Sequence, residues 1–156
     1  YNCIVLENYP LGTLDGFLDA QTISPKLKRK ILQDVAAALA HLHAYHFVYR
    51  QLNPASILIP TTKLSQSPHA KLCGFSTIAK SDTVAQLTFV PSQDFIYFAD
   101  PAVFTQEPAE YSTDIFSFGV LLLMVYYNEL PTEVFNRTNS DLALLHRNGE
   151  VCSMPD

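Results

Sequence analysis

The chain has 156 residues, and 48% of them are hydrophobic, which is enough for one domain with a packed core. Its formal net charge of −5 argues against nucleic acid or an acidic membrane surface as the main partner. The longest apolar run, 115–127, is shorter than the roughly 20 residues that span a bilayer, so we expect a buried core helix and no membrane insertion.

The first residues predict a short strand and a linker, together residues 1–12. The apolar run ends at Leu6, and Glu7 and Tyr9 follow in a turn-rich segment. Thr13 can then cap a short helical turn. A strand, a loop and a helix occur in many folds, so this segment alone is a weak signal.

A long helix is predicted from residue 25 onward. Ser24 is a typical N-cap, and Pro25 suits the first helical position. Apolar residues then recur at the three- and four-residue steps of one buried helical face. They are Leu27, Ile31, Val35, Ala38 and Leu42.

This helix carries a cluster of basic residues at its start and several histidines near its end. Four of the residues in 26–30 are basic, which suggests a phosphate-binding site, but a solvated helix face is the favoured interpretation. His41, His43 and His46 are expected at the helix end and in a turn. No carboxylate or cysteine completes a set of metal ligands with them.

The stretch 47–59 organises the rest of the chain. Two apolar residues lead into a polar loop, and a short apolar run leads out, which predicts a strand, a tight loop and a second strand. The loop begins with Tyr49 and Arg50, followed by Gln51, and Ser56 lies near its end.

A further strand is expected at 70–73, directly before Gly74 and Phe75. Residues 76–101 are predicted to be loop-like. Residues 114–127 predict a helix that is apolar on nearly all sides and therefore surrounded by other elements. A last helix is expected over 140–147, closed by Asn148 and Gly149.

Taken in order, these segments resemble protein kinases. Residues 49–56 are similar to the catalytic loop, whose pattern is His/Tyr-Arg-Asp, four variable residues, then Asn. Residues 74–76 stand in the place of Asp-Phe-Gly, and 114–119 are similar to the Asp-x-Trp-Ser-x-Gly start of the family's central helix. Residues 1–12 are similar to the hinge. Four segments in the family's order make a specific signal.

The resemblance implies an α+β, predominantly helical fold, namely the C-terminal lobe of a protein-kinase-like domain. Such a lobe has a hinge strand, helices around a buried central helix and small β-hairpin elements. Residues 1–156 would form a partial domain that runs from the hinge to the helix ending near Gly149. The small lobe would be missing, and 76–101 would be the activation segment.

The resemblance also implies structural roles and nucleotide contacts. In the family, the aspartate of the central helix hydrogen-bonds the catalytic-loop backbone, so Asp114 should reach the backbone near Tyr49 or Arg50. Phe75 and Gly119 are further packing positions. The candidate contacts on the adenine side of the cleft are Leu6, Glu7, Tyr9 and Leu58.

The groups that carry out chemistry in the family are substituted here. Gln51 stands where the catalytic Asp belongs, Ser56 and Gly74 replace the two metal ligands, and Asn53 stands where Ser/Thr kinases usually carry Lys. Phosphoryl transfer needs metal ions and a carboxylate that orients the acceptor hydroxyl. A glutamine cannot accept a proton at neutral pH, a glycine has no ligand and a serine is a weak one.

The implied function is that of a pseudokinase, a catalytically impaired domain that acts as a binding or allosteric signalling module. Its partner would be a kinase or another signalling protein, with no cofactor or metal expected for this chain alone. One alternative is an active kinase that uses ATP and magnesium and whose missing parts lie outside this chain. Others are a truncated, non-functional product and, last, an unrelated helical binding domain.

The number and spacing of the cysteines indicate the cellular compartment of the protein. Cys3, Cys73 and Cys152 are odd in number, lie far apart and form no Cys-x-x-Cys pair. This spacing predicts reduced thiols and a cytoplasmic location, and it gives no sign of a metal site.

Overall fold

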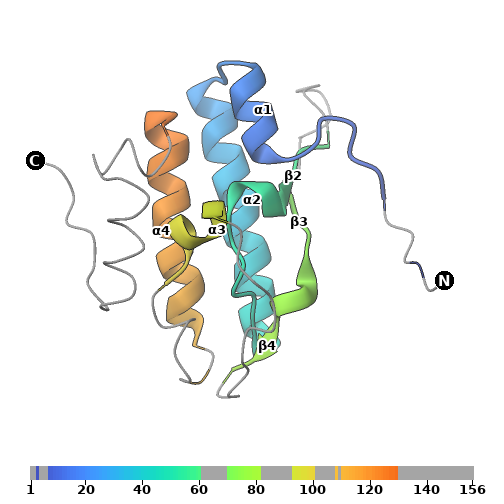
Figure 1. Ribbon diagram of the computed structural model, residues 1–156, viewed down its shortest axis with the longest axis vertical. Coiled ribbons are helices and arrows are strands. Elements are labelled where there is room, and N and C mark those ends of the chain that lie inside the picture. The colour runs from blue at the N-terminus through green and yellow to red at the C-terminus, as the bar shows by residue number, and fades with distance from the viewer. Residues whose placement is uncertain are drawn as a thin grey trace, which may run out of the picture.

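Two long helices dominate the computed structural model, which describes residues 3, 7–60, 70–81, 93–100, 108 and 110–129. Helices α2 (Pro25–Ala44) and α4 (Tyr111–Tyr127) lie side by side, and α1 (Leu14–Ala20) lies at one end of the pair (Figure 1). Helix α2 contacts both α4 and the short strand β3 (Lys71–Leu72), which pairs with β2 (Ile57–Leu58). The described chain is therefore mostly helical, with small antiparallel sheets.

Helix α2 begins where the sequence predicts. The Ser24 side chain accepts a hydrogen bond from the Leu27 backbone N–H at 3.3 Å, and Pro25 is the first helical residue. The buried face is centred on Ile31 and Val35, as expected, but its third fully buried position is Leu39. The predicted Ala38 is only half-buried, because the apolar face follows the helix period of 3.6 residues towards Leu39.

Helix α4 forms as predicted but is less enclosed than its sequence suggests. Its buried face includes Asp114, Leu121 and Val125. It ends at Asn128, which has the left-handed φ of 61° that asparagine tolerates at a helix C-terminus. Among the described residues, no element covers its outer face, so the expectation that other elements surround the helix is wrong there. The exposed apolar residues there are Ile115, Leu122, Tyr126 and Tyr127.

Two antiparallel ladders frame the polar loop of residues 49–56. Strand β1 (Phe47–Val48) pairs with β4 (Ala79–Lys80), and β2 pairs with β3. The two predicted strands that flank the loop therefore both exist, but each pairs with a later strand. This pairing holds the segment between β3 and β4 against the loop.

The region expected to be loop-like contains regular structure where it is described. A 3-10 helix (Phe75–Thr77), strand β4 and helix α3 (Gln93–Phe98) occur there. The backbone partners on β1 stabilise β4, and α3 packs against α4 with Phe98 buried. The sequence pattern could not show these long-range partners.

The helical turn predicted after Thr13 is α1, but the Thr13 side chain makes no capping hydrogen bond. The predicted helix over 140–147 and the hinge residue Leu6 lie outside the described residues. Among the described helices, none is both long and apolar enough to cross a bilayer.

Adjacent leucines of α4 provide a test of this core. Leu121 is 0% exposed and Leu122 is 40% exposed. We expect Leu121→Ala to lower the free energy of unfolding by about 2–5 kcal/mol, because it leaves a cavity in the hydrophobic core. Leu122→Ala should cost less than about 1 kcal/mol. Urea unfolding followed by circular dichroism measures both, and equal losses would contradict this packing.

Candidate functional site

The carboxylate of Asp114 anchors the polar loop. Its Oδ2 accepts a hydrogen bond from the Tyr49 backbone N–H at 2.8 Å, and its Oδ1 accepts one from the Arg50 N–H at 2.7 Å. The side chain is 0% exposed, so these bonds replace the water that the buried charge has lost. The predicted contact between Asp114 and the backbone near Tyr49 and Arg50 is confirmed.

A third partner of this carboxylate is His43, in the last turn of α2. The His43 Nε2 atom lies 2.8 Å from Asp114 Oδ2, the oxygen that also bonds to Tyr49. The His43 ring packs on the Tyr111 ring, with ring centroids 4.7 Å apart. An ionised carboxylate only accepts hydrogen bonds, so Nε2 is the donor. Sequence reasoning treated His43 as a helix-end residue. The useful signal was the chemical need of a buried carboxylate for a further donor close to the loop.

Arg50 adopts an unusual backbone conformation. Its φ is 67°, in the left-handed region that costs a residue with a Cβ about 1–2 kcal/mol. The backbone N–H bonds of Tyr49 and Arg50 to Asp114 hold this turn in place. The side chain is buried as well, and burial lowers the pKa of its guanidinium while the Asp114 carboxylate opposes that shift.

Tyr49 connects the loop to the segment after β3. Its hydroxyl donates to the Cys73 carbonyl, and its ring meets Phe75 edge-on at 5.8 Å. Burial raises the pKa of the Tyr49 hydroxyl above its ordinary value. The Thr77 hydroxyl lies 3.1 Å from the Tyr49 carbonyl, which adds a second link. Residues 73–77 are thus fixed against the loop.

Gln51 and Gly74, two of the substituted positions, come together across this junction. Gln51 Oε1 lies 3.1 Å from the Thr77 hydroxyl. A Cβ built on Gly74 would lie 4.0 Å from Gln51 Oε1 and 4.0 Å from the Tyr49 hydroxyl. The structure therefore brings these two substituted positions close to each other.

Ser56, the third substituted position, is occupied by contacts within the loop. Its hydroxyl accepts from the Asn53 backbone N–H at 3.1 Å and donates to the Asn53 carbonyl at 2.7 Å. The Asn53 side chain in turn donates to the Gln51 carbonyl at 3.0 Å. Both Ser56 and Asn53 are buried, and they hold the 3-10 helix Pro54–Ser56 in place.

These residues do not fit a magnesium–nucleotide site. Magnesium in such sites is held by carboxylates and other oxygen ligands. Position 74 has no side chain, Ser56 has its hydroxyl engaged, and Gln51 is a neutral amide beside Thr77. Within the described ranges, no group of three or more His, Cys, Asp or Glu residues could hold a metal ion.

Two residues expected at packing positions lie at the surface. Phe75 is 50% exposed, although one edge of its ring contacts Tyr49. Gly119 is exposed, and a Cβ built on it would meet no atom of the described chain within 4 Å. Gly119 faces outward on α4, so close helix packing does not require a glycine there.

Of the four candidates on the adenine side, Glu7 and Tyr9 lie beside β3. The Tyr9 hydroxyl donates to Glu7 Oε2 at 2.5 Å, and Lys71 Nζ lies 3.4 Å from the same oxygen. The Tyr9 hydroxyl, and after it Lys71, lowers the pKa of Glu7. Leu58 is half-buried in β2 and bridges to Thr13. Leu6 lies outside the described residues.

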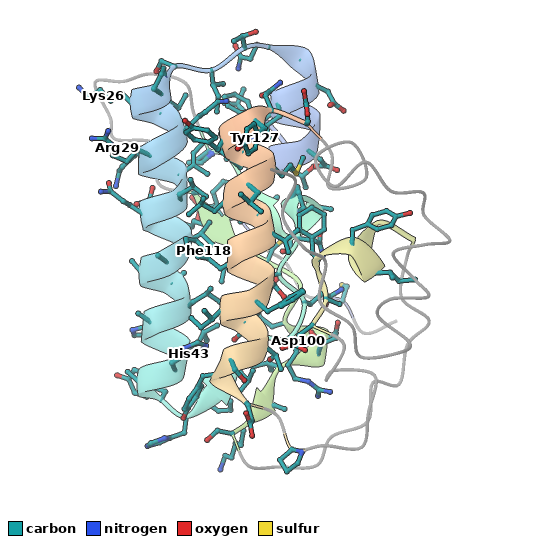
Figure 2. All side chains as sticks on the ribbon, turned by 90° about the vertical axis from the view of Figure 1, so that its left-hand side faces the viewer. Lys26, Arg29, His43, Asp100, Phe118 and Tyr127 are labelled. Carbon is teal, nitrogen blue, oxygen red and sulfur yellow. The ribbon has the colours of Figure 1, made fainter. Side chains whose placement is uncertain are left out.

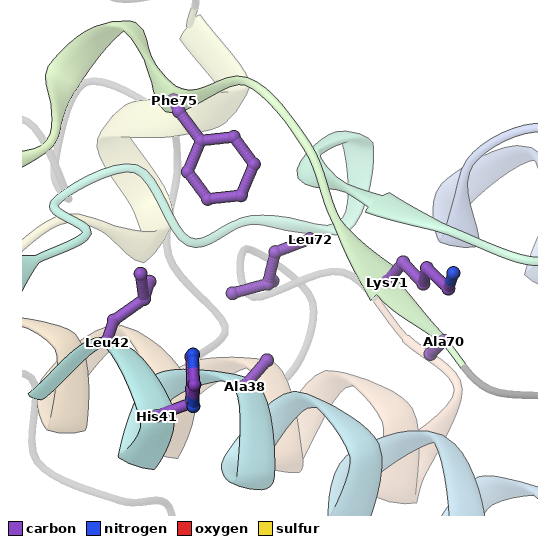
Figure 3. A pocket seen from close by; sticks show the side chains of 7 residues that line it. All are labelled: Ala38, His41, Leu42, Ala70, Lys71, Leu72 and Phe75. Atoms are coloured by element: carbon purple, nitrogen blue, oxygen red, sulfur yellow. The ribbon is translucent and has the colours of Figure 1, made fainter. Parts of the chain in front are cut away.

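A shallow apolar pocket of about 380 Å³ lies between α2 and β3 (Figure 3). Phe75 lies at its upper edge in the figure, and Lys71 marks the β3 side. Neither Glu7 nor Leu58 lines it, so the adenine-side candidates do not converge on this pocket. Its remaining lining residues are Ala38, His41, Leu42, Ala70 and Leu72.

Comparisons with known proteins agree with the sequence motifs. The model of the protein kinase domain family matches residues 1–152. Mitogen-activated protein kinase kinase kinase 13-B of Xenopus laevis is 28% identical over 83% of this chain and 13% of its own length. The L-type lectin-domain containing receptor kinase V.9 of Arabidopsis thaliana is 29% identical over 82% of the chain and 19% of its own length.

A receptor-like serine/threonine-protein kinase of Arabidopsis thaliana is 30% identical over 85% of this chain. The match covers 37% of that protein. The chain thus spans well under half the length of each of these curated relatives.

The anchoring role of Asp114 can be tested by Asp114→Asn. The side-chain amide of asparagine has the same shape as the carboxylate, but its NH2 group would face one of the three donors that bond to Asp114. We therefore expect the variant to lose about 3–5 kcal/mol of unfolding free energy. Asp19→Asn on the exposed side of α1 is the control and should change stability by less than about 0.5 kcal/mol. In nuclear magnetic resonance spectra, the Tyr49 and Arg50 amide signals should shift only in the first variant.

Proposed function

The chain belongs to the protein kinase domain family, and we propose that within this family it is a pseudokinase, a catalytically impaired domain. It corresponds to the C-terminal lobe and acts as a binding or allosteric module. Its partner is a protein, either a kinase or another signalling protein. Neither ATP nor magnesium takes part in its function.

The observation that carries this proposal is that the loop keeps its backbone shape although its metal-binding and catalytic positions are substituted. Its shape is preserved by the Asp114 carboxylate, which holds the Tyr49 and Arg50 backbone. Its polar side chains bond within the loop, as the Ser56 hydroxyl does with the Asn53 backbone, and position 74 offers no ligand. A site that keeps its frame without groups to bind metal suits recognition better than phosphoryl transfer.

The same anchored loop also favours a second candidate. An active ATP-dependent protein kinase requires a catalytic loop of fixed shape, and the relatives named above are kinases. In that case, Gln51 would have to orient the acceptor hydroxyl without accepting its proton. We rank this candidate second because the loss of the base and of both metal ligands removes the main sources of transition-state stabilisation.

The proposal includes a cytoplasmic location. Its support is the chemistry of the cysteines: both of those in the described residues, Cys3 and Cys73, are free thiols. Free thiols persist in reducing compartments. Burial raises the pKa of Cys73, which makes that thiol a poor nucleophile.

Calorimetric titration with ATP tests the proposal. We expect no magnesium-dependent binding by the chain. The double variant Gly74→Asp with Ser56→Asn should gain it in a protein that also has the small lobe, because a carboxylate and an amide oxygen would converge on one ion. Aspartate tolerates the φ of 74° at this position better than most residues. Ser56→Asn removes a cap worth about 1 kcal/mol, so folding is checked first by circular dichroism.

The matched control is Gly74→Asn with Ser56→Asn, which has the same shape without the charge and should not bind. Binding of ATP and magnesium by the unaltered chain, abolished by EDTA, would contradict the proposal. Phosphate transfer by the unaltered protein at about 1 per second would establish the active-kinase candidate instead.

A further inference from the structure

Hydrogen bonds hold the segment that follows β3 on the polar loop. The Cys73 N–H donates to the Ser56 carbonyl at 2.9 Å, and the Tyr49 hydroxyl donates to the Cys73 carbonyl. The Thr77 hydroxyl lies 3.1 Å from the Tyr49 carbonyl and 3.1 Å from Gln51 Oε1. We call this set of bonds the clasp.

The clasp holds the chain on both sides of Gly74. This residue has a left-handed φ of 74° and no side chain that could pack on the loop. Glycine loses more backbone freedom on folding than any other residue, so a segment that contains it needs fixed points on either side. Cys73 provides the fixed point before Gly74, and the buried Thr77 provides the one after it.

The loop itself is fixed by a different element. The Tyr49 N–H donates to Asp114 at 2.8 Å, whereas the Tyr49 carbonyl faces Thr77. Asp114 also meets His43, and Figure 2 shows His43 at the end of α2 that lies beside the start of α4. The clasp therefore fixes the segment after β3 relative to both long helices.

The number of protons at Thr77 favours an amide at position 51. A hydroxyl has one proton to donate, and the Tyr49 carbonyl can only accept it. The Gln51 amide carries an oxygen and a donor NH2 group, which a half-turn of the amide exchanges. With the NH2 group facing Thr77, both bonds form. A carboxylate at position 51 could only accept, so it would compete with the Tyr49 carbonyl for the same proton.

We infer that Gln51 is a positioning residue that closes the clasp through its amide. Gln51 donates to the Thr77 hydroxyl, which donates to the Tyr49 carbonyl. The position at which the family has its catalytic Asp has thereby acquired a role that a carboxylate does not fill. The segment after β3 is held in one conformation without nucleotide or metal. A site that is fixed before binding loses less conformational entropy on binding, which suits a recognition module.

This role of Gln51 rests on the proposed function, because only a domain without phosphoryl transfer can give up the carboxylate at position 51. The two proposals fail separately. Calorimetry with ATP and magnesium tests for nucleotide binding, whereas the clasp is tested by the coupling of positions 51 and 77. Nucleotide binding would leave that coupling measurable, and an absent coupling would leave the calorimetric result unchanged.

Hydrogen–deuterium exchange of the whole chain, followed by nuclear magnetic resonance, tests the clasp. The reporter is the Cys73 amide, whose bond to Ser56 belongs to the clasp. Gln51→Glu keeps the length and shape of the side chain but removes its donor. We expect exchange at Cys73 to become about three- to tenfold faster, as the loss of one hydrogen bond implies. Exchange at Val35, buried in the middle of α2, should change less than about twofold.

Two matched controls accompany this variant. Gln33→Glu makes the same chemical change on the exposed side of α2 and should leave exchange at Cys73 unchanged. Thr77→Ser retains the hydroxyl and should keep the rate within about twofold of the parent, whereas Thr77→Val should raise it as Gln51→Glu does. Gln51 is only half-buried, so its variant is expected to fold, which circular dichroism checks. If it does not fold, Gln51→Asn, whose amide is too short to reach Thr77, takes its place with the same expected result.

A double-mutant cycle separates the clasp from a simple effect of charge. In the Thr77→Val background, Gln51→Glu should change exchange at Cys73 less than about twofold, because the bonds are already broken. An effect of equal size with and without the Thr77 hydroxyl would overturn the inference, since a buried charge alone would then loosen the segment. An unchanged Cys73 rate in Gln51→Glu or in Thr77→Val would overturn it as well.

Discussion

A single buried carboxylate, that of Asp114, determines how the described elements fit together. It lies in the first turn of α4, accepts hydrogen bonds from two consecutive backbone N–H groups of the loop, and meets His43 from the last turn of α2. Burial of a charge is costly unless every lone pair that faces the protein is satisfied. The donors belong to the loop and to the end of α2, so this one carboxylate fixes both of them relative to the start of α4.

This anchor acts on the backbone and leaves the loop side chains to other contacts. Gln51 is held by Thr77, and Ser56 and Asn53 bond to each other. In relatives that transfer phosphate, the corresponding positions face metal and substrate. Here they stabilise the loop itself, so the loop of this family member keeps its shape through contacts directed inward. The loop can keep its shape without the groups that transfer phosphate. Its shape depends on backbone groups, whereas phosphate transfer depends on the ends of the side chains.

The sequence predicts local features well and long-range ones poorly. Ser24 and Pro25 mark the start of α2 because capping is decided within one turn, and the link from Asp114 to the loop follows from the family motif. The role of His43 and the pairing of β4 were not visible, because each depends on a partner more than 30 residues away. The exposure of Phe75 was also missed, since a motif gives a position in the chain but not what covers it.

The nested pairing of the strands has a consequence for the order of folding. The β2–β3 ladder lies inside the β1–β4 ladder along the chain, with Ile57 opposite Leu72 and Phe47 opposite Lys80. Closing a long loop costs more conformational entropy than closing a short one. Formation of the inner ladder first shortens the segment that the outer ladder must close, so the two should assemble from the inside outward. The strained turn at Arg50, between β1 and β2, would then take its final shape late, when the outer ladder and the α4 carboxylate come together around it.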